Sequence, residues 1–126
     1  TKADGEALVE AVHRAAAEAA AAVPGARIEL SGGVLRFPLE RTAESARILD
    51  AYGAAARASG LGGGEAGLIG GGSDASTSSA MGIASIDGLG PRGLGFHTKD
   101  EQIEVRTLVP KAQALARFLL SRARPG

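Results

Sequence analysis

The amino-acid sequence predicts an α/β fold in which helices alternate with short strands. Long stretches carry apolar residues three and four positions apart, which is the spacing of one helix face. Shorter runs of Ile, Leu and Val stand between glycines, as buried strands do. The resulting order, one helix and one strand followed by α-β-α-β-α, is typical of a layered α/β domain.

Composition limits the functional classes. The 126 residues suffice for one small domain, and 14 basic residues balance 14 acidic ones, so we expect no nucleic-acid partner. The absence of cysteine excludes disulfides and cysteine-ligated zinc. No apolar run approaches about 18 residues, so we expect no membrane span and a cytoplasmic location. Richness in Ala and Gly, with Arg in excess of Lys, suggests a bacterial origin.

The first helix is predicted to begin behind Thr1, which can form a capping box with Asp4. Pro24 and Gly25 end it. Residues 27–31 alternate polar and apolar side chains, which predicts a half-buried strand. The apolar face of this helix comprises Leu8, Val12, Ala16, Ala19 and Val23.

A connector, "RFPLER" (36–41), leads to a second helix that is predicted to start behind Thr42 and to end near Gly60. Pro38 holds the connector extended. The glycine-rich segment that follows the helix is predicted to be a loop. The apolar side of the second helix comprises Ile48, Leu49, Tyr52 and Ala56.

The remaining segments are shorter. Short strands are predicted at residues 67–69, 83–86 and 103–105, with a short helix running through Met81. Thr107 is predicted to cap the last helix, whose early Pro110 lies where no backbone donor is needed. The apolar face of that helix comprises Leu108, Ala112, Leu115 and Leu119.

The character of the chain changes within the stretch "SGGVLRFPLER" (31–41). One helix and one strand cannot enclose a core alone. Residues 1–35 are therefore predicted to be the C-terminal part of one domain, and residues 36–126 the C-terminal part of another.

The turn "GGGSDAS" (70–76) permits two interpretations. Glycines before a helix start let backbone N–H groups bind an anion, here a carboxylate. No lysine follows, so it is not a nucleotide-binding P-loop. Alternatively, the turn is structural, with Ser73 or Asp74 as helix N-cap.

The sequence offers two candidate site residues, Arg36 and His97, and a second histidine, His13. Arg36 follows a Gly-Gly break and could clamp a carboxylate, or it could be a surface arginine. His97 lies in a glycine-rich loop and could be a metal ligand or a hydrogen-bonded structural residue. His13 falls on the polar face of the first helix, where we expect it to be solvated.

The order of these motifs adds information that no single one carries. "RFPLER", then "GGGSDAS", then "GIASIDGLG" (82–90) and "HTKDE" (97–101) occur in series. This series resembles the C-terminal third of the dinuclear zinc metallopeptidase and aminoacylase family. That family includes glutamate carboxypeptidase, succinyl-diaminopimelate desuccinylase, acetylornithine deacetylase and aminoacylase. The resemblance runs from about residue 1 to 122 and is greatest to the glutamate carboxypeptidase branch.

The resemblance implies roles for five residues. His97 would bind one of two zinc ions. Gly71, Gly72 and Ser73 would lie near the substrate carboxylate, and Arg36 would hold that carboxylate. Residues 1–31 would be the last helix and strand of an inserted dimerisation (lid) domain, which implies a homodimer.

The other zinc ligands and the catalytic Glu of that family lie in "HxD", "D…EE" and "D" elements, and none of these occurs here. We therefore expect a C-terminal fragment of a zinc-dependent exopeptidase or amidohydrolase. The intact hydrolase would cleave an amide bond next to a free carboxylate, in a peptide or N-acyl amino acid, with two zinc ions. The fragment alone would be inactive. The alternatives are a non-catalytic binding or dimerisation module from the same family, and an independent anion-binding α/β domain.

Overall fold

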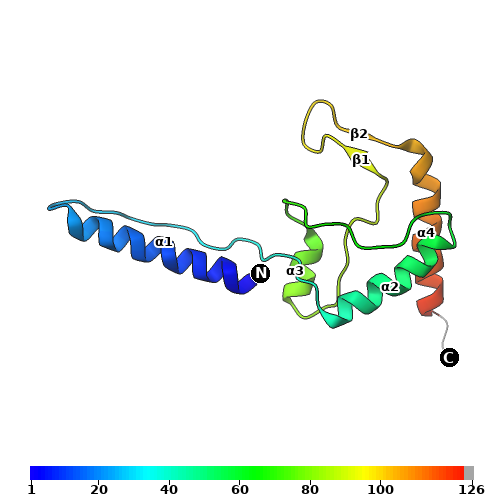
Figure 1. The fold of residues 1–126 in the computed structure, drawn as a ribbon, viewed down its shortest axis with the longest axis horizontal. Helices are drawn as coiled ribbons and strands as arrows, with labels where there is room; N and C mark the ends of the chain where they lie inside the picture. The colour runs from blue at the N-terminus through cyan, green and yellow to red at the C-terminus, as the bar shows by residue number, and fades with distance from the viewer. Residues whose placement is uncertain (124–126) are drawn as a thin grey trace. The chain divides into compact units, whose positions relative to one another are not determined.

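The computed structural model describes residues 1–123 and is rich in helices, with one small sheet (Figure 1). This agrees with the α/β class in its general form. The chain divides into two compact units: residues 1–40 with 72–83, and residues 41–71 with the chain from Ala84 onward. The predicted division at residue 35 into parts of two domains stays a prediction. The elements are α1 (Lys2–Ala22), α2 (Ala43–Arg57), α3 (Asp74–Ala80), β1 (Gly93–Leu94), β2 (Gln102–Ile103), η1 (Val105–Thr107) and α4 (Leu108–Ala123).

Helix α1 begins as its sequence predicts. The Thr1 hydroxyl accepts a hydrogen bond from the backbone N–H of Asp4 at 3.2 Å, and the Asp4 side chain completes the capping box. The helix ends before Val23, and Gly25 adopts a left-handed φ of 80°. The chain then runs back along α1 (Figure 1).

The strand predicted at residues 27–31 is absent, so the prediction of one helix and one strand for residues 1–35 is right only for the helix. The same correction applies to residues 67–69 and 83–86, which also form no strand. Alternation of side chains determines which face is apolar, but a strand also needs a neighbouring segment that supplies ladder hydrogen bonds. The one sheet of the described chain consists of β1 and β2 and includes none of these three segments.

The second unit is built on the packing of α2 against α4. The Thr42 hydroxyl accepts the N–H of Ser45 at 3.0 Å, which caps α2 as predicted. Tyr52 of α2 meets Phe118 of α4 edge to face, with ring centroids 6.0 Å apart. The buried apolar residues of the described chain are Tyr52, Ala56 and Ala114, with Leu61, Ile86, Leu89 and Phe118 packed against them.

The buried face of α4 differs from the predicted one. Ala114 is fully buried and Phe118 is half-buried, whereas the predicted Leu108, Leu115 and Leu119 are exposed. A small residue at the crossing lets two helices approach closely, so α2 contacts the Ala114 side. The leucine side of α4 is left without a partner in the described chain.

No helix within residues 1–123 is both long enough and apolar enough to cross a membrane.

Candidate functional site

Arg36 contacts the glycine turn that precedes α3. Its Nη1 donates a hydrogen bond to Oδ1 of Asp74 at 3.2 Å. The same nitrogen lies 3.3 Å from the position that a Cβ would take at Gly72, and Cδ of Arg36 lies 3.5 Å from it. The absence of a side chain at residue 72 therefore lets the guanidinium lie against the turn. Two elements that the sequence suggested separately meet here.

The turn itself is fixed by Ser73. Its hydroxyl accepts the N–H of Ala75 at 3.1 Å, and its carbonyl accepts the hydroxyl of Ser76 at 2.6 Å. Ser73 is therefore the N-cap of α3. This agrees with the structural interpretation of the turn, and it leaves the hydroxyl hydrogen of Ser73 available to a ligand. Gly71 has a φ of 151°, and a Cβ there would meet nothing within 4 Å.

The Arg36 guanidinium retains capacity for an anion. Its side chain is 48% exposed, and among the described residues only Asp74 accepts a hydrogen bond from it. The Asp74 side chain is fully exposed, so the ion pair lies in water and contributes little to stability. An incoming carboxylate can bind the remaining N–H groups of Arg36 without removing a strong partner.

The connector that carries Arg36 is held to the start of α1. Glu40 accepts a hydrogen bond from the backbone N–H of Lys2 at 2.5 Å. The Lys2 ammonium lies 4.8 Å from the centroid of the Phe37 ring, within cation–π distance. These contacts restrain the connector on both sides of Pro38.

His97 lies in the loop of a β-hairpin. β1 pairs antiparallel with β2, with Gly93 opposite Ile103, and residues 95–101 join them. His97 has a φ of 63° and is the one non-glycine residue with positive φ in residues 1–123. Such a conformation costs an ordinary residue of the order of 1–3 kcal/mol, and residues that keep it often serve a function.

Thr107 fastens this hairpin to the helical unit. Its hydroxyl accepts the N–H of Arg92 at 3.0 Å and donates to the carbonyl of Glu104 at 2.7 Å. The sequence places Thr107 correctly before α4, but its side chain joins the hairpin instead of capping that helix. The base of the hairpin is therefore anchored at the start of α4. Thr107 precedes a helix in the sequence, which predicts a cap. Its contact with Arg92 depends on the hairpin, which the sequence did not predict.

The described part of the chain contains no complete zinc site. Residues 1–123 contain no group of three or more His, Cys, Asp or Glu side chains that could hold a metal ion. The imidazole of His97 is exposed and can supply one ligand, with Asp100 and Glu101 following it in the loop. A zinc site takes three or four protein ligands, of which His97 could supply one.

The candidate residues are distributed over both units. Arg36, Gly72 and Ser73 belong to the first, and Gly71 and His97 to the second. The sequence did not predict the contacts that two residues make. Asp74 is the carboxylate that holds Arg36, and Glu101 is the carboxylate that contacts the backbone of His97 at 3.3 Å. Both lie close to a residue that sequence reasoning did select, which was the available signal.

Comparison of the chain with protein-family models, with curated proteins and with solved structures finds no match.

Proposed function

We propose that this chain is the C-terminal part of a bacterial, cytoplasmic, zinc-dependent exopeptidase or amidohydrolase of the glutamate carboxypeptidase type. The observation that carries the proposal is the contact between Arg36 and the turn at Gly72. A guanidinium with unused N–H groups, restrained beside a glycine turn, suits a substrate carboxylate. The intact protein would cleave an amide bond next to that carboxylate, in a peptide or an N-acyl amino acid.

In this proposal each residue has one task. Arg36 binds and orients the carboxylate, and Asp74 keeps the guanidinium on the turn. Gly71, Gly72 and Ser73 let the substrate approach the backbone. His97 supplies one ligand to a centre of two zinc ions, which polarise the amide carbonyl when they are bound. The remaining ligands and the general base come from polypeptide outside this chain.

Hydrolysis by the full-length protein tests the proposal. Peptides and N-acyl amino acids with a free C-terminal carboxylate should be cleaved, and the same compounds with an amidated C-terminus should react at least about tenfold more slowly. Equal rates for the two series would contradict carboxylate recognition.

A second assay uses the 126-residue chain alone with added zinc. It should not turn over either series, because it carries neither a complete metal site nor the base. Turnover above that of its His97→Ala variant would show that the active site is wrongly located.

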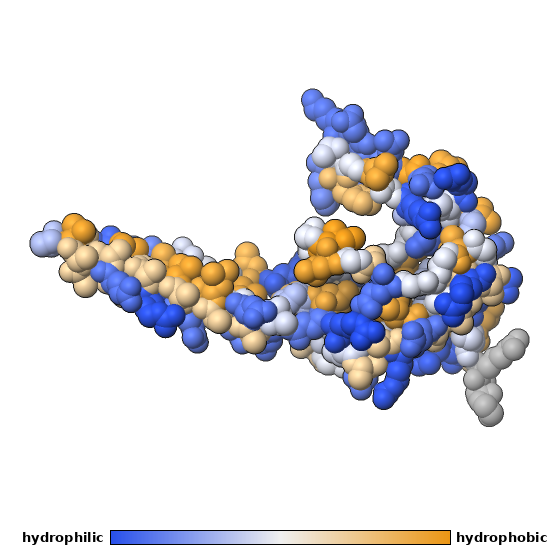
Figure 2. Space-filling view, viewed as in Figure 1, coloured by the Kyte–Doolittle hydropathy of each residue, from blue (hydrophilic) through white to orange (hydrophobic). Residues whose placement is uncertain are grey.

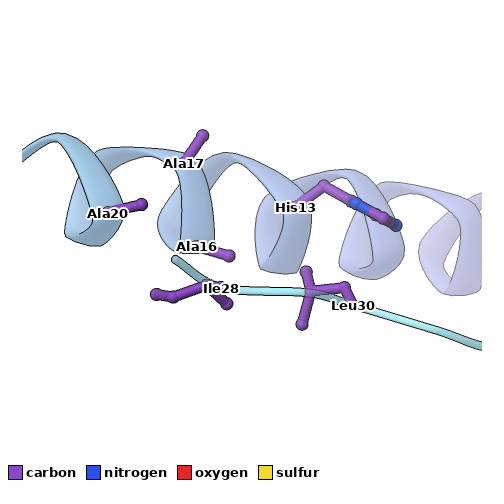
Figure 3. A pocket seen from close by; sticks show the side chains of 6 residues that line it. All are labelled: His13, Ala16, Ala17, Ala20, Ile28 and Leu30. Atoms are coloured by element: carbon purple, nitrogen blue, oxygen red, sulfur yellow. The ribbon is translucent and has the colours of Figure 1, made fainter. Parts of the chain in front are cut away.

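A non-catalytic dimerisation module is the second candidate, and a groove on the first unit favours it. The groove lies between α1 and the returning chain and has a volume of about 250 Å³ (Figure 3). Apolar side chains also lie exposed along α1 (Figure 2). Residues lining the groove are His13, Ala16, Ala17, Ala20, Ile28 and Leu30.

Sedimentation and hydrolysis of the full-length protein separate the two candidates. A homodimer that hydrolyses carboxylate substrates supports the enzyme, which we expect to be dimeric through this region. A homodimer without hydrolytic activity in the presence of zinc supports the module. An Ala16→Glu substitution, which introduces a charge into the groove, should weaken the dimer in either case.

A further inference from the structure

We propose that Glu101 is a positioning residue for His97. The inference rests on the proposed function in one respect, namely that the His97 imidazole has a ligand to bind. Its physical content concerns the backbone and is independent of zinc. Oε2 of Glu101 accepts a hydrogen bond from the backbone N–H of His97 at 3.3 Å, across four positions of the hairpin loop.

The conformation of His97 needs such a restraint. A left-handed φ brings the Cβ of an ordinary residue close to its own backbone, and glycine escapes that contact. His97 has a φ of 63° and is exposed, and it is the third residue of a turn that the Thr98 N–H closes on the Gly95 carbonyl at 3.0 Å. Local hydrogen bonds therefore keep the loop in this state, and Glu101 supplies the one that a side chain makes with His97 itself.

The rest of the loop is built to present Glu101 to that N–H group. Thr98 Oγ1 donates to the carbonyl of Gly95 at 2.6 Å and accepts the N–H of Asp100 at 3.2 Å. The carbonyl of Thr98 accepts the N–H of Glu101 at 3.3 Å. A Cβ at Gly95 would lie 2.8 Å from the carbonyl oxygen of Asp100, so the loop closes tightly enough to exclude any other residue there.

The direction of the imidazole follows from this closure. Reversing the sign of φ at residue 97 would turn its Cα–Cβ bond away from its present direction. The ring would then leave its place at the hairpin tip even though every other element remained folded. Glu101 thus acts on the ring through the backbone N–H group of His97.

Asp100 provides a matched control. It is an acid in the same loop, one position from Glu101, and its side chain accepts no hydrogen bond from His97. Glu101→Ala removes the acceptor and one negative charge. Asp100→Ala removes one negative charge only. Glu101→Gln removes the charge but keeps an acceptor oxygen at the same reach.

Nuclear magnetic resonance of the 15N- and 13C-labelled 126-residue chain, or of the full-length protein, tests the inference. A positive φ brings the amide proton of His97 close to its own Hα and so gives a strong intraresidue nuclear Overhauser cross-peak between them. We expect that cross-peak in the wild type, in Asp100→Ala and in Glu101→Gln, and its loss in Glu101→Ala. Retention in Glu101→Ala, equal loss in Asp100→Ala, or loss in Glu101→Gln would each overturn the assignment.

Zinc affinity of the full-length protein supplies the second readout. Loss of a residue that orients a metal ligand lowers affinity by about 10- to 100-fold, and we expect that range for Glu101→Ala and a near-normal value for Glu101→Gln. One outcome is that His97→Ala leaves zinc binding unchanged while the His97 cross-peak is lost only in Glu101→Ala. In that case the proposed function fails and the backbone role of Glu101 stands. If Glu101→Ala binds zinc normally while His97→Ala does not, the positioning role fails and the proposed function stands.

Discussion

The guanidinium of Arg36 lies against Gly72, where Nη1 is 3.3 Å from the position a Cβ would occupy, and the same nitrogen donates to Asp74 at 3.2 Å. Residues 38 positions apart in the sequence thus form one small surface. The contact depends on glycine at residue 72, because any side chain there would displace the guanidinium of Arg36. This relationship joins the connector to the turn and supports the proposed carboxylate site.

Gly72→Ala should weaken substrate binding while the fold remains. The new Cβ would meet Nη1 of Arg36 at 3.3 Å and shift the guanidinium by a few tenths of an ångström. We expect KM for carboxylate substrates to rise by up to about tenfold in the full-length protein, with kcat less affected. Gly70→Ala is the matched control, because a Cβ there meets nothing within 4 Å. Equal KM values for both variants would contradict the contact.

Arg36→Ala should remove the charge-assisted contact with the substrate carboxylate. We expect kcat/KM to fall by an amount that corresponds to about 1.5–3 kcal/mol of lost transition-state stabilisation. The zinc content should not change. The control is Arg27→Ala, because Arg27 is an exposed arginine of the same unit that pairs with Glu29. Steady-state kinetics and metal analysis of both variants decide between a substrate clamp and a surface arginine. Normal kinetics for Arg36→Ala would favour the surface role.

His97→Ala should leave the fold intact, because His97 is exposed and belongs to no apolar contact of the core. In the full-length protein we expect the loss of about one zinc ion per chain and of nearly all activity. Atomic emission and circular dichroism measure these two properties. His13→Ala, in the other histidine of the chain, should retain both zinc ions. Full zinc content in His97→Ala would identify a structural histidine.

Tyr52→Phe should stabilise the α2–α4 packing. The Tyr52 hydroxyl is buried without a hydrogen-bond partner in the described chain, and an unsatisfied buried polar group costs about 1–3 kcal/mol. We expect the free energy of unfolding to rise by about 1 kcal/mol, as measured in urea. Tyr52→Ala, which also removes the ring packed on Phe118, should instead destabilise.

The same residue predicts a pH dependence. Burial raises the pKa of the Tyr52 phenol above its ordinary value of 10.0. The folded state therefore holds this proton more tightly than the unfolded state, and stability is lost as pH rises above about 10. Urea titrations should show this decline in the wild type and a smaller decline in Tyr52→Phe. An identical decline in both proteins would exclude Tyr52 as its source.

Gly63→Ala should destabilise the second unit. A Cβ at residue 63 would lie 2.3 Å from Nη1 of Arg57 and 3.1 Å from the backbone oxygen of Gly53. The arginine can move, but the backbone of α2 cannot, so we expect a loss of about 1 kcal/mol. Gly62→Ala, where a Cβ meets nothing within 4 Å, should be neutral or slightly stabilising. Chemical denaturation compares the pair.

The sequence alone determined the features that depend on neighbours along the chain. Thr1 with Asp4 begins α1, and Thr42 begins α2, as the sequence predicts. Ser73 is the N-cap of α3, as one of the interpretations of the glycine turn predicts. Helix hydrogen bonds join residues four positions apart, so the information for starting and ending a helix is local.

Only the tertiary structure decided the features that require a distant partner. Residues 27–31 alternate polar and apolar side chains as a strand does, yet they are not part of the sheet of the described chain. The sequence did not predict β1, which forms because β2 lies opposite it. α4 buries Ala114 and leaves Leu115 and Leu119 exposed, because α2 selects the face that it contacts. Arg36 and Asp74 meet because two remote segments fold together. Ladder pairing, helix-face selection and side-chain contacts between remote segments depend on the whole packed chain, which local sequence patterns do not encode.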